Sequence, residues 1–341
     1  MSTAYLVTGS SGFIGSHFCT ACGRLLGRRS ILYGIDIAVP DSGIDYTHTT
    51  ADIRLPESLS QLSIEDPQVI IHLAAKAEVV TPFAETGDLG LTNVGGTANL
   101  LQHLKPRTFI FASSSAVYGN SGSRGVPPSF SHVKPVGTYG VSKVFGELIC
   151  ADWCRERRGS AVAFRFGNVV GAQSRGFIPF LVRHAQMHPE GDEPAQCRGK
   201  GRVLRDYVPV DYIVALLWAA AARKWEAAEF RVFNAGTGRG MTNGEVAEVV
   251  GQILLRHGYR LNICWESPLA PGESKSIVLE MKETEKTFGL PVPDRASVVA
   301  AIEQSVLSWL ARPLAVTSVQ GTGRTHSQAD PGPTRPARRS A

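Results

Sequence analysis

A tyrosine and a lysine stand four residues apart at the start of one candidate helix. They are Tyr139 and Lys143 in the string YGVSK. Residues at i and i+4 share a helix face, so the phenol and the ammonium group would be neighbours. Tyrosine, with a reference pKa of about 10, is a poor base at neutral pH, but a nearby positive charge stabilises its phenolate. A YxxxK string is common by itself and also fits a surface tyrosine beside a solvated lysine, so the acid/base interpretation depends on a second element of the sequence.

Several hydroxyl groups follow a candidate strand upstream of this pair. The apolar run 109–112 continues into Ser113, Ser114 and Ser115. Hydroxyls at the carboxyl end of a parallel strand face the crevice in which such sheets bind ligands. With Tyr139, they indicate hydride transfer at an alcohol carbon.

A glycine-rich turn near the start of the chain could hold a dinucleotide. Gly9, Gly12 and Gly15 lie in TGSSGFIG, between an apolar strand and a helix. They permit a tight turn, close approach of the backbone to a pyrophosphate and close packing of helix on strand, while the helix N-terminus offers N–H groups to the anion. We expect this turn, with Phe13 and Ile14, to bind the cofactor.

An acidic residue closes the next expected strand. Asp36 lies 21 residues after Gly15. A carboxylate there binds both ribose hydroxyls and repels a 2′-phosphate, which favours NAD over NADP. A solvated aspartate at a strand end would explain the residue type but not this spacing.

The serines, the glycine turn and Asp36 can form one site only if the fold brings the ends of their strands together. In the first 170 residues, short β-branched runs alternate with longer helical patterns, which is typical of an α/β protein with a Rossmann-type doubly wound parallel sheet. The expected strands are 5–8, 31–35, 69–73, 108–112 and 161–166, and the expected helices are 12–26, 93–104 and 142–157.

The pattern becomes less regular after Gly171, with helices expected at 177–188, 210–224 and 243–257 and a strand at 231–234. We therefore expect three parts. Residues 1–170 form the NAD-binding core, to which a later strand and helix return. Residues 171–312 form mainly a smaller mixed α/β C-terminal cap that binds substrate. Residues 313–341, rich in arginine and proline, form a disordered tail.

Composition and charge exclude several classes of protein. The chain has 341 residues, of which 43% are hydrophobic and 19% charged, so it is neither fibrous nor mainly disordered. Its net charge is +5, but the tail carries +3 of it, so the rest is not a basic domain and no nucleic-acid partner is expected. The longest apolar run, 213–222, falls short of the roughly 20 residues of a membrane span. With no secretion signal at the N-terminus, we expect a cytoplasmic protein without a membrane partner.

Six cysteines are too sparse for a disulfide scaffold. Cys19 with Cys22, and Cys150 with Cys154, have spacings that could suit zinc. Both pairs lie in amphipathic helical stretches, so we expect packing thiols and no metal site.

A series of motifs, in order, resembles the extended short-chain dehydrogenase/reductases. The similar branch is the NAD-dependent nucleotide-sugar epimerase/dehydratase family, typified by UDP-glucose 4-epimerase. The resemblance covers roughly residues 4–310. Its motifs are TGSSGFIG (8–15), Asp36, Asp52-Ile53, HLAA (72–75), NVGGT (93–97), SSSAVYG (113–119), YGVSK (139–143), RFGNVVG (165–171), RDYVPVD (205–211) and NAGTG (234–238).

The resemblance implies further roles. Ser114, four residues before Tyr118, matches the family's catalytic serine or threonine, which hydrogen-bonds the reacting oxygen; Ser115 is the near alternative, and both would contact substrate. Lys143 would hold the nicotinamide ribose beside Tyr139. The other cofactor-binding residues would be Asp52 and Ile53 at the adenine, Leu73, Ala74 and Ala75 along the cofactor channel, and Asn93.

The same resemblance separates two reactions. Dehydratases of this family carry an acid two residues before the tyrosine of VYG, usually with a second polar acid beside it. This chain has Ala116 and Ser115 there. We therefore expect reversible inversion at C4 of a nucleoside-diphosphate sugar such as UDP-glucose, UDP-glucuronate or a UDP-N-acetylhexosamine. Tyr139 would remove the 4-hydroxyl proton while hydride passes to NAD, and both would return after the 4-keto sugar turns over.

Three residues are expected at the substrate by the same resemblance. Asn168 and Arg205 match positions that contact the nucleotide diphosphate, and Arg175 would approach the sugar. For Arg205 the alternative is an ion pair with Asp206 or Asp211.

Some positions depart from the family pattern. No basic residue precedes the turn in the segment 270–273, and Pro209 and Tyr212 replace a usual histidine and acid. These departures leave the sugar and the nucleotide open. Lys275 is a candidate for the missing charge.

Three alternatives remain from the sequence. A 4-ketoreductase or a dehydratase would share the fold, and a non-catalytic NAD-binding regulator would belong to another class, although such regulators typically lose the Tyr/Lys pair. Members of the family usually pair as homodimers through the helices that correspond to 93–104 and 142–157, so a homodimer is expected.

Overall fold

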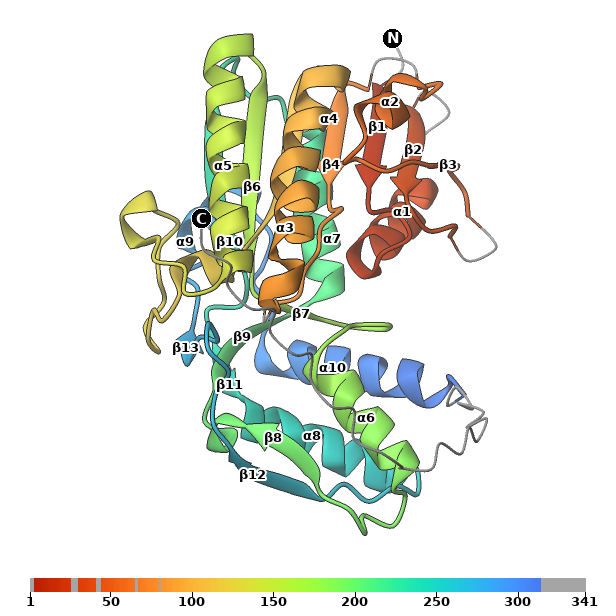
Figure 1. Ribbon diagram of the computed structural model, residues 1–341, viewed down its shortest axis with the longest axis vertical. Helices are drawn as coiled ribbons and strands as arrows, with labels where there is room; N and C mark the ends of the chain where they lie inside the picture. Colours follow the sequence, from red (N-terminus) through yellow and green to blue (C-terminus); the bar gives the residue numbers. More distant parts are fainter. Residues whose placement is uncertain (1–2, 26–29, 41–43, 65–66, 80, 314–341) are drawn as a thin grey trace, which may run out of the picture.

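Seven parallel strands form the central sheet of the computed structural model, which describes residues 3–25, 30–40, 44–64, 67–79 and 81–313 (Figure 1). These strands are β1 (Thr3–Thr8), β2 (Ser30–Asp36), β3 (Thr47–Thr50), β4 (Val69–His72), β5 (Thr108–Ser114), β6 (Ser160–Phe166) and β10 (Phe230–Ala235). Their order across the sheet is β10-β6-β5-β4-β1-β2-β3. The chain leaves β1 toward one edge and returns to β4 on its other side, and sheets of this type bind ligands at the strand ends beside such a reversal.

Alternate residues of β1 face two different parts of the core. Tyr5 and Val7 pack in a cluster with α1 (Phe13–Leu25) and α7 (Val210–Ala222). Ala4 and Leu6 pack in a second cluster with α4 (Gly96–Leu104) and α5 (Thr138–Arg157). Successive side chains of a strand point to opposite faces, so both faces of the sheet are covered by helices. The expected Rossmann-type fold is confirmed.

Short helical segments complete this layer. Helix α2 (Pro56–Ser60) packs against α4. Helix α3 (Thr86–Gly90) continues through a π-helical turn, Leu91–Gly95, into α4, so this helical segment begins earlier than the sequence pattern indicates. Helix α9 (Lys282–Phe288) contacts β10 and α7 near the other edge of the sheet.

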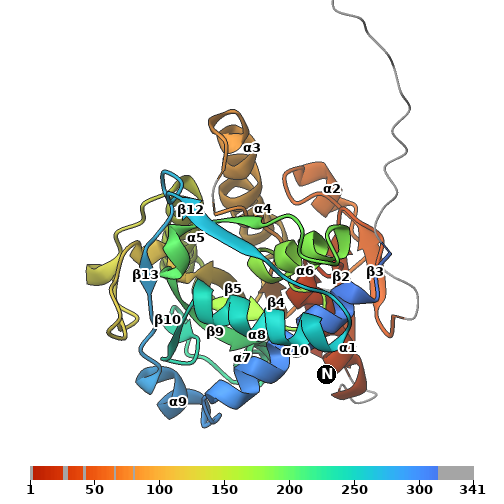
Figure 2. The ribbon, with the colours of Figure 1, turned by 90° about the horizontal axis from the view of Figure 1, so that it is seen from below.

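A smaller unit lies at the carboxyl ends of the central strands. Its strand β9 (Leu204–Pro209) pairs with β7 (Asn168–Val170), β11 (Gly240–Thr242) and β13 (Ser276–Ile277), and β8 (Ala195–Arg198) pairs with β12 (Ile263–Ser267). Helices α6 (Phe177–Met187), α8 (Asn243–Arg256) and α10 (Arg295–Leu310) share a core of their own. Figure 2 shows this cap from below, with α8 and α10 in front of the central sheet.

The sequence pattern missed most of the short elements and, among the longer ones, β9 and α10. The edge strand β3 is short and polar, and in β9 the charges of Arg205 and Asp206 and the ring of Pro209 interrupt the alternation of apolar residues. Helix α10 carries a readable start signal, because Asp294 caps it by accepting the Ser297 N–H at 2.9 Å. The residue boundaries of core and cap stay predictions, and the expected tail lies, from residue 314 on, outside the described residues.

The cysteines pack as expected. Cys19, Cys22, Cys150, Cys154 and Cys197 are buried free thiols. Within the described part of the chain, no three His, Cys, Asp or Glu side chains gather closely enough to hold a metal ion. In the same residues no helix is both long and apolar enough to cross a membrane.

Candidate active site

The glycine turn between β1 and α1 is packed too tightly for side chains. Gly9 has φ +72°, and a Cβ there would lie 2.7 Å from the Ala74 backbone nitrogen. A Cβ on Gly15 would overlap the Gly9 carbonyl oxygen, while the Gly12 N–H donates to that oxygen at 3.0 Å. The turn thus leads directly into the N-terminus of α1, at Phe13 and Ile14, whose first-turn N–H groups have no acceptor within the helix. This geometry fits a dinucleotide pyrophosphate.

Asp36 stands beside this turn at the end of β2. Its Oδ2 accepts the Ser11 N–H and its Oδ1 accepts the Ala38 N–H, both at 3.0 Å. Each carboxylate oxygen keeps a further lone pair for another donor. The structure therefore holds the carboxylate in one orientation with capacity left for the hydroxyls of a ribose.

The end of β4 lies against β1. The Leu73 N–H donates to the Thr8 carbonyl oxygen and the Ala74 N–H to Thr8 Oγ1, both at 3.1 Å. Thr8 Oγ1 also lies 2.7 Å from His72 Nδ1. Burial lowers the pKa of His72 to about 3, so this imidazole is neutral. Ala75, which follows, is half-buried beside the same strand ends.

Asp52 and Ile53 lie beyond β3. The Asp52 carboxylate pairs with the Arg54 guanidinium at 2.7 Å, and this hydrogen-bonded pair holds the pKa of Asp52 below its usual range. The Ile53 side chain is buried against Gly96, where a Cβ would lie 2.5 Å from Ile53 Cδ1. The structure gives Asp52 an ionic partner that sequence reasoning did not foresee.

Asn93 connects three segments through its side-chain amide. Its Oδ1 accepts the Lys76 N–H at 2.8 Å, and its Nδ2 donates to the Lys76 carbonyl oxygen at 2.9 Å and to Ser142 Oγ at 3.0 Å. Both amide protons are therefore used within the protein. Asn93 fixes the chain after Ala75 against helix α5, which is a positional role toward the cofactor channel.

Tyr139, Lys143 and Ser114 come together where β5 ends and α5 begins. The Lys143 Nζ lies 5.8 Å from the centre of the Tyr139 ring and donates to the Ala112 carbonyl oxygen at 2.8 Å. The Ser114 side chain lies close enough to Tyr139 to lower the pKa of the phenol, and its Oγ accepts the Ala116 N–H at 3.2 Å. Tyr139 and Lys143 are 8% and 4% exposed, so they face each other out of water.

Burial dominates the titration of this cluster. It raises the pKa of Tyr139 to about 12, and the neighbouring Ser114 side chain opposes part of that rise. It lowers the pKa of Lys143 to about 8, and the negative charge of Glu147 opposes that shift. Further positive charge near the phenol favours loss of its proton, and an oxidised nicotinamide supplies such a charge.

The neighbouring serines point elsewhere. Ser113 Oγ donates to Glu147 Oε1 at 2.6 Å, and Ser115 is buried at the start of a 3₁₀ turn, Ser115–Tyr118. Of the three serines, Ser114 is the one that meets Tyr139.

The expected substrate residues lie on the cap side. Arg205, on β9, donates to the carbonyl oxygens of Leu204 (3.0 Å) and Ser274 (2.5 Å), and burial lowers its pKa. Asp206 instead accepts N–H groups of Thr237, Gly238 and Leu279 and the Thr237 hydroxyl. Arg205 thus makes no ion pair with Asp206 or Asp211 in the described structure.

Asn168, on β7, and Arg175, in the loop before α6, are both exposed. The described structure shows no hydrogen bond from either to Tyr139 or Ser114. Lys275, also exposed, follows Ser274 and donates its N–H to Asn120 Oδ1 at 2.5 Å.

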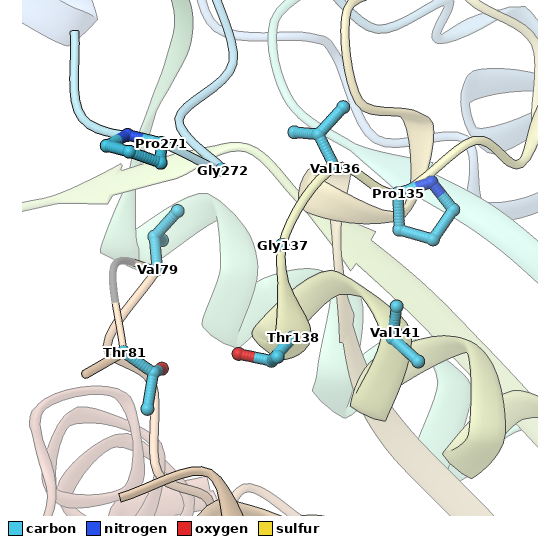
Figure 3. A pocket seen from close by; sticks show the side chains of 9 residues that line it. All are labelled: Val79, Thr81, Pro135, Val136, Gly137, Thr138, Val141, Pro271 and Gly272. Carbon is cyan, nitrogen blue, oxygen red and sulfur yellow. The ribbon is translucent and has the colours of Figure 1, made fainter. Parts of the chain in front are cut away.

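A cavity of about 380 Å³ lies at the start of α5 (Figure 3). It separates Val79, Thr81 and the start of α5 from the cap turn at Pro271 and Gly272. Figure 3 shows the Thr138 hydroxyl pointing into this space, toward Thr81. Sequence reasoning missed these lining residues, although Thr138 directly precedes Tyr139. The lining residues are Val79, Thr81, Pro135, Val136, Gly137, Thr138, Val141, Pro271 and Gly272.

A profile of the NAD dependent epimerase/dehydratase family matches residues 5–236, from the first strand of the central sheet to the last. The chain belongs to this family. Its cofactor is accordingly NAD, in agreement with the fit of the glycine turn and of Asp36.

Relatives in the family include epimerases and a reductase. UDP-glucose 4-epimerase of Mycoplasma pneumoniae is 28% identical over 305 residues, which cover 76% of this chain and 83% of the relative. GDP-6-deoxy-D-mannose reductase of Pseudomonas aeruginosa is 31% identical over 184 residues, 52% of this chain and 56% of the relative. A solved structure of UDP-glucuronic acid 4-epimerase from Bacillus cereus, in complex with UDP-glucuronic acid and NAD, has a TM-score of 0.77 and 25% identity, and the match covers 89% of this chain and 99% of that one.

Proposed function

We propose that this family member is an NAD-dependent 4-epimerase of a nucleoside-diphosphate sugar and works through a transient 4-keto sugar. The observation that carries the proposal is the buried cluster of Tyr139, Ser114 and Lys143 at the carboxyl end of β5. A phenol, a hydroxyl and a cation in this arrangement can move one proton on and off an alcohol oxygen.

Bound NAD supplies the acceptor, and then the donor, of the hydride at the sugar C4. Tyr139 takes the proton of the 4-hydroxyl and later returns it. Ser114 hydrogen-bonds the reacting oxygen and keeps it next to the phenol. Lys143, held by the Ala112 carbonyl oxygen, binds the nicotinamide ribose and contributes the positive charge that favours the phenolate.

Cofactor binding beyond the glycine turn follows the family pattern. We assign Asp52 and Ile53 to the adenine and Leu73 to Ala75 to the cofactor channel, with Asn93 bracing that channel from behind. On the substrate side, we assign Asn168 and Arg205 to the diphosphate and Arg175 to the sugar. Arg205 uses only two carbonyl acceptors and has further N–H donors for phosphate oxygens.

Dehydration is disfavoured by the same site. Ala116 has no proton to transfer, and the buried Ser115 is not an acid. A 4-ketoreductase is the second candidate, because the Pseudomonas aeruginosa relative is a reductase. Net oxidation of NADH or NADPH during turnover would favour it.

The test is incubation of the purified protein with UDP-, dTDP-, CDP- and GDP-sugars, with chromatographic separation of C4 epimers. We expect interconversion without net change in cofactor, and a loss of about a thousandfold or more in Tyr139→Phe. The matched control is Tyr259→Phe, which removes a tyrosine hydroxyl from the cap. This variant should keep full turnover. Normal NAD binding with no turnover of any sugar would point to a non-catalytic regulator.

We also propose a homodimer formed through α4 and α5. Val141, Phe145 and Leu148 are 41%, 52% and 47% exposed and lie at i, i+4 and i+7 on one face of α5. Such an apolar stripe on a surface helix is typical of a helix-packing interface. The expected cytoplasmic location stays a prediction, to be tested by cell fractionation.

A further inference from the structure

A fully buried ion pair lies directly behind the candidate catalytic cluster. Glu147, on α5, and Arg165, on β6, are both 0% exposed in their side chains. Arg165 Nε donates to Glu147 Oε1 at 2.8 Å and Nη2 donates to Oε2 at 2.7 Å, so the pair is bidentate. Ser113 Oγ donates to Oε1 at 2.6 Å as a third bond.

Three residues of α5 contact three consecutive residues at the end of β5. Glu147 binds the Ser113 hydroxyl, Lys143 binds the Ala112 carbonyl oxygen, and Tyr139 lies beside the Ser114 side chain, which lowers the pKa of the phenol. Residues 139, 143 and 147 are spaced by four and therefore share one helix face. Of these three residues on α5, Glu147 lies furthest from the reacting groups.

Arg165 connects Glu147 to the segment of chain that precedes Tyr139. It is the register partner of Ser113 across β5 and β6. Its guanidinium lies 4.9 Å from the centre of the Tyr118 ring and 5.3 Å from that of Phe130, and it donates to the Ser129 carbonyl oxygen at 3.2 Å. One ion pair thus connects β5, β6, α5 and the loop that leads into α5.

Stability alone is a weak reason for such a pair. A buried ion pair commonly contributes no more to folding than well-packed apolar residues of the same volume, because removing two charges from water is costly. What the pair does provide is a fixed geometry, since a bidentate carboxylate admits little rotation.

We propose that Glu147, held by Arg165, is a positioning residue for the hydride-transfer reaction. Through the Ser113 hydroxyl it fixes the end of β5, so that the Ser114 hydroxyl meets both the Tyr139 phenol and the sugar oxygen. This role rests on the proposed function. The negative charge of Glu147 also favours the charged form of Lys143.

Glu147→Ala would leave the buried charge of Arg165 without an ionic partner and is expected to unfold the protein. The test therefore uses Ser113→Ala, which removes only the hydroxyl between Glu147 and β5. Ser113→Thr restores a hydroxyl. Ser160→Ala is the matched control, because Ser160 is also buried and hydrogen-bonded, at the opposite end of β6.

Single-turnover absorbance of reduced nicotinamide and steady-state epimerisation give kcat and KM for each variant. We expect Ser113→Ala to lower kcat about tenfold with KM changed less than about twofold, and Ser113→Thr to recover most of the loss. Ser160→Ala should lose a similar amount of thermal stability and keep wild-type kcat.

Two results would overturn the proposal in distinguishable ways. Equal kcat in Ser113→Ala and Ser160→Ala, with an active wild type, would show that Glu147 has a structural role alone. No hydride transfer by the wild-type protein from any sugar nucleotide would refute the proposed function, and the positioning role with it.

Discussion

Tyr139 and Lys143 differ from ordinary surface residues because they are buried together. Removal from water disfavours the charged form of each, which raises the pKa of the phenol and lowers that of the amine. The protein therefore keeps a costly charge inside its core at neutral pH. A site of this kind reduces stability in exchange for reactivity.

Lys143→Met should stabilise the fold and abolish turnover. The pKa of Lys143 is about 8 in the folded protein, against 10.5 for a free lysine, which corresponds to about 3 kcal/mol of destabilisation at pH 7. Loss of the hydrogen bond to the Ala112 carbonyl oxygen offsets about 1 kcal/mol. Urea unfolding should thus show a gain of about 2 kcal/mol at pH 7.

The pH dependence of that gain follows from proton binding. Between the folded pKa of about 8 and the unfolded value of 10.5, the unfolded chain binds more protons at Lys143, so the wild type becomes more stable as pH rises. The advantage of Lys143→Met should shrink across this window. Lys286→Met, at an exposed position, should show no such gain. A destabilised Lys143→Met at pH 7 would contradict the argument.

At the scale of elements, the turn from β1 to α1 and the junction of β5 with α5 create the two halves of the site. The first places the Ser11 N–H of the turn against Asp36, and the second places Tyr139 beside Ser114. Both lie at the carboxyl ends of the central strands. The sheet topology therefore brings the candidate cofactor site and the proposed acid/base group to one edge.

Gly15→Ala should disrupt the first of these junctions. An added Cβ would overlap the Gly9 carbonyl oxygen, and relief requires movement of the turn or of the start of α1. We expect NAD affinity, measured by fluorescence titration, to fall at least about tenfold because the N–H groups lose their alignment with the pyrophosphate.

Gly251→Ala is the control for Gly15→Ala, because it adds the same Cβ in another helix. Gly251 lies in α8, where a Cβ would meet its nearest neighbour, Leu261, at 4.0 Å. This substitution should leave NAD affinity unchanged and stabilise the protein by about 0.5–1 kcal/mol. Unaltered NAD affinity in Gly15→Ala would show that the turn is not the binding site.

At the scale of the whole molecule, the central sheet and the cap contribute different parts of the candidate site. Residues that fit NAD lie in the sheet layer, and the cap turn at Gly272 lines the other side of the cavity. Arg205 donates to the carbonyl oxygen of Ser274, two residues beyond that turn. Outside the tail, the chain is almost electrically neutral. Positive charge is therefore local, which fits the proposed recognition of a diphosphate by single arginines.

Phe145→Asp should dissociate the proposed dimer. A carboxylate in the middle of the apolar stripe on α5 would have to be buried without a partner, which costs several kcal/mol and weakens association about a thousandfold. Analytical ultracentrifugation would measure the change in mass. Leu255→Asp, on the exposed surface of α8, should leave the mass unchanged. A wild-type protein that sediments as a monomer would refute the dimer.

Local spacing allowed much of this site to be predicted. The glycine turn, Asp36, and the Tyr139–Lys143 pair depend on intervals along one strand or one helix, and those intervals are set by backbone geometry. The central strands were predictable for the same reason. Charged and short strands such as β3 and β9 were not, since tertiary pairing rather than side-chain pattern stabilises them.

Only the tertiary structure decided which partner each polar side chain of the site has. It selected Ser114 over Ser113 and Ser115 to meet Tyr139, freed Arg205 from Asp206, and joined Glu147 to Arg165 on a neighbouring strand. These choices depend on which residues far apart in the chain approach within hydrogen-bonding distance. Periodicity along the sequence carries no such information, whereas packing of α5 against β5 and β6 fixes it.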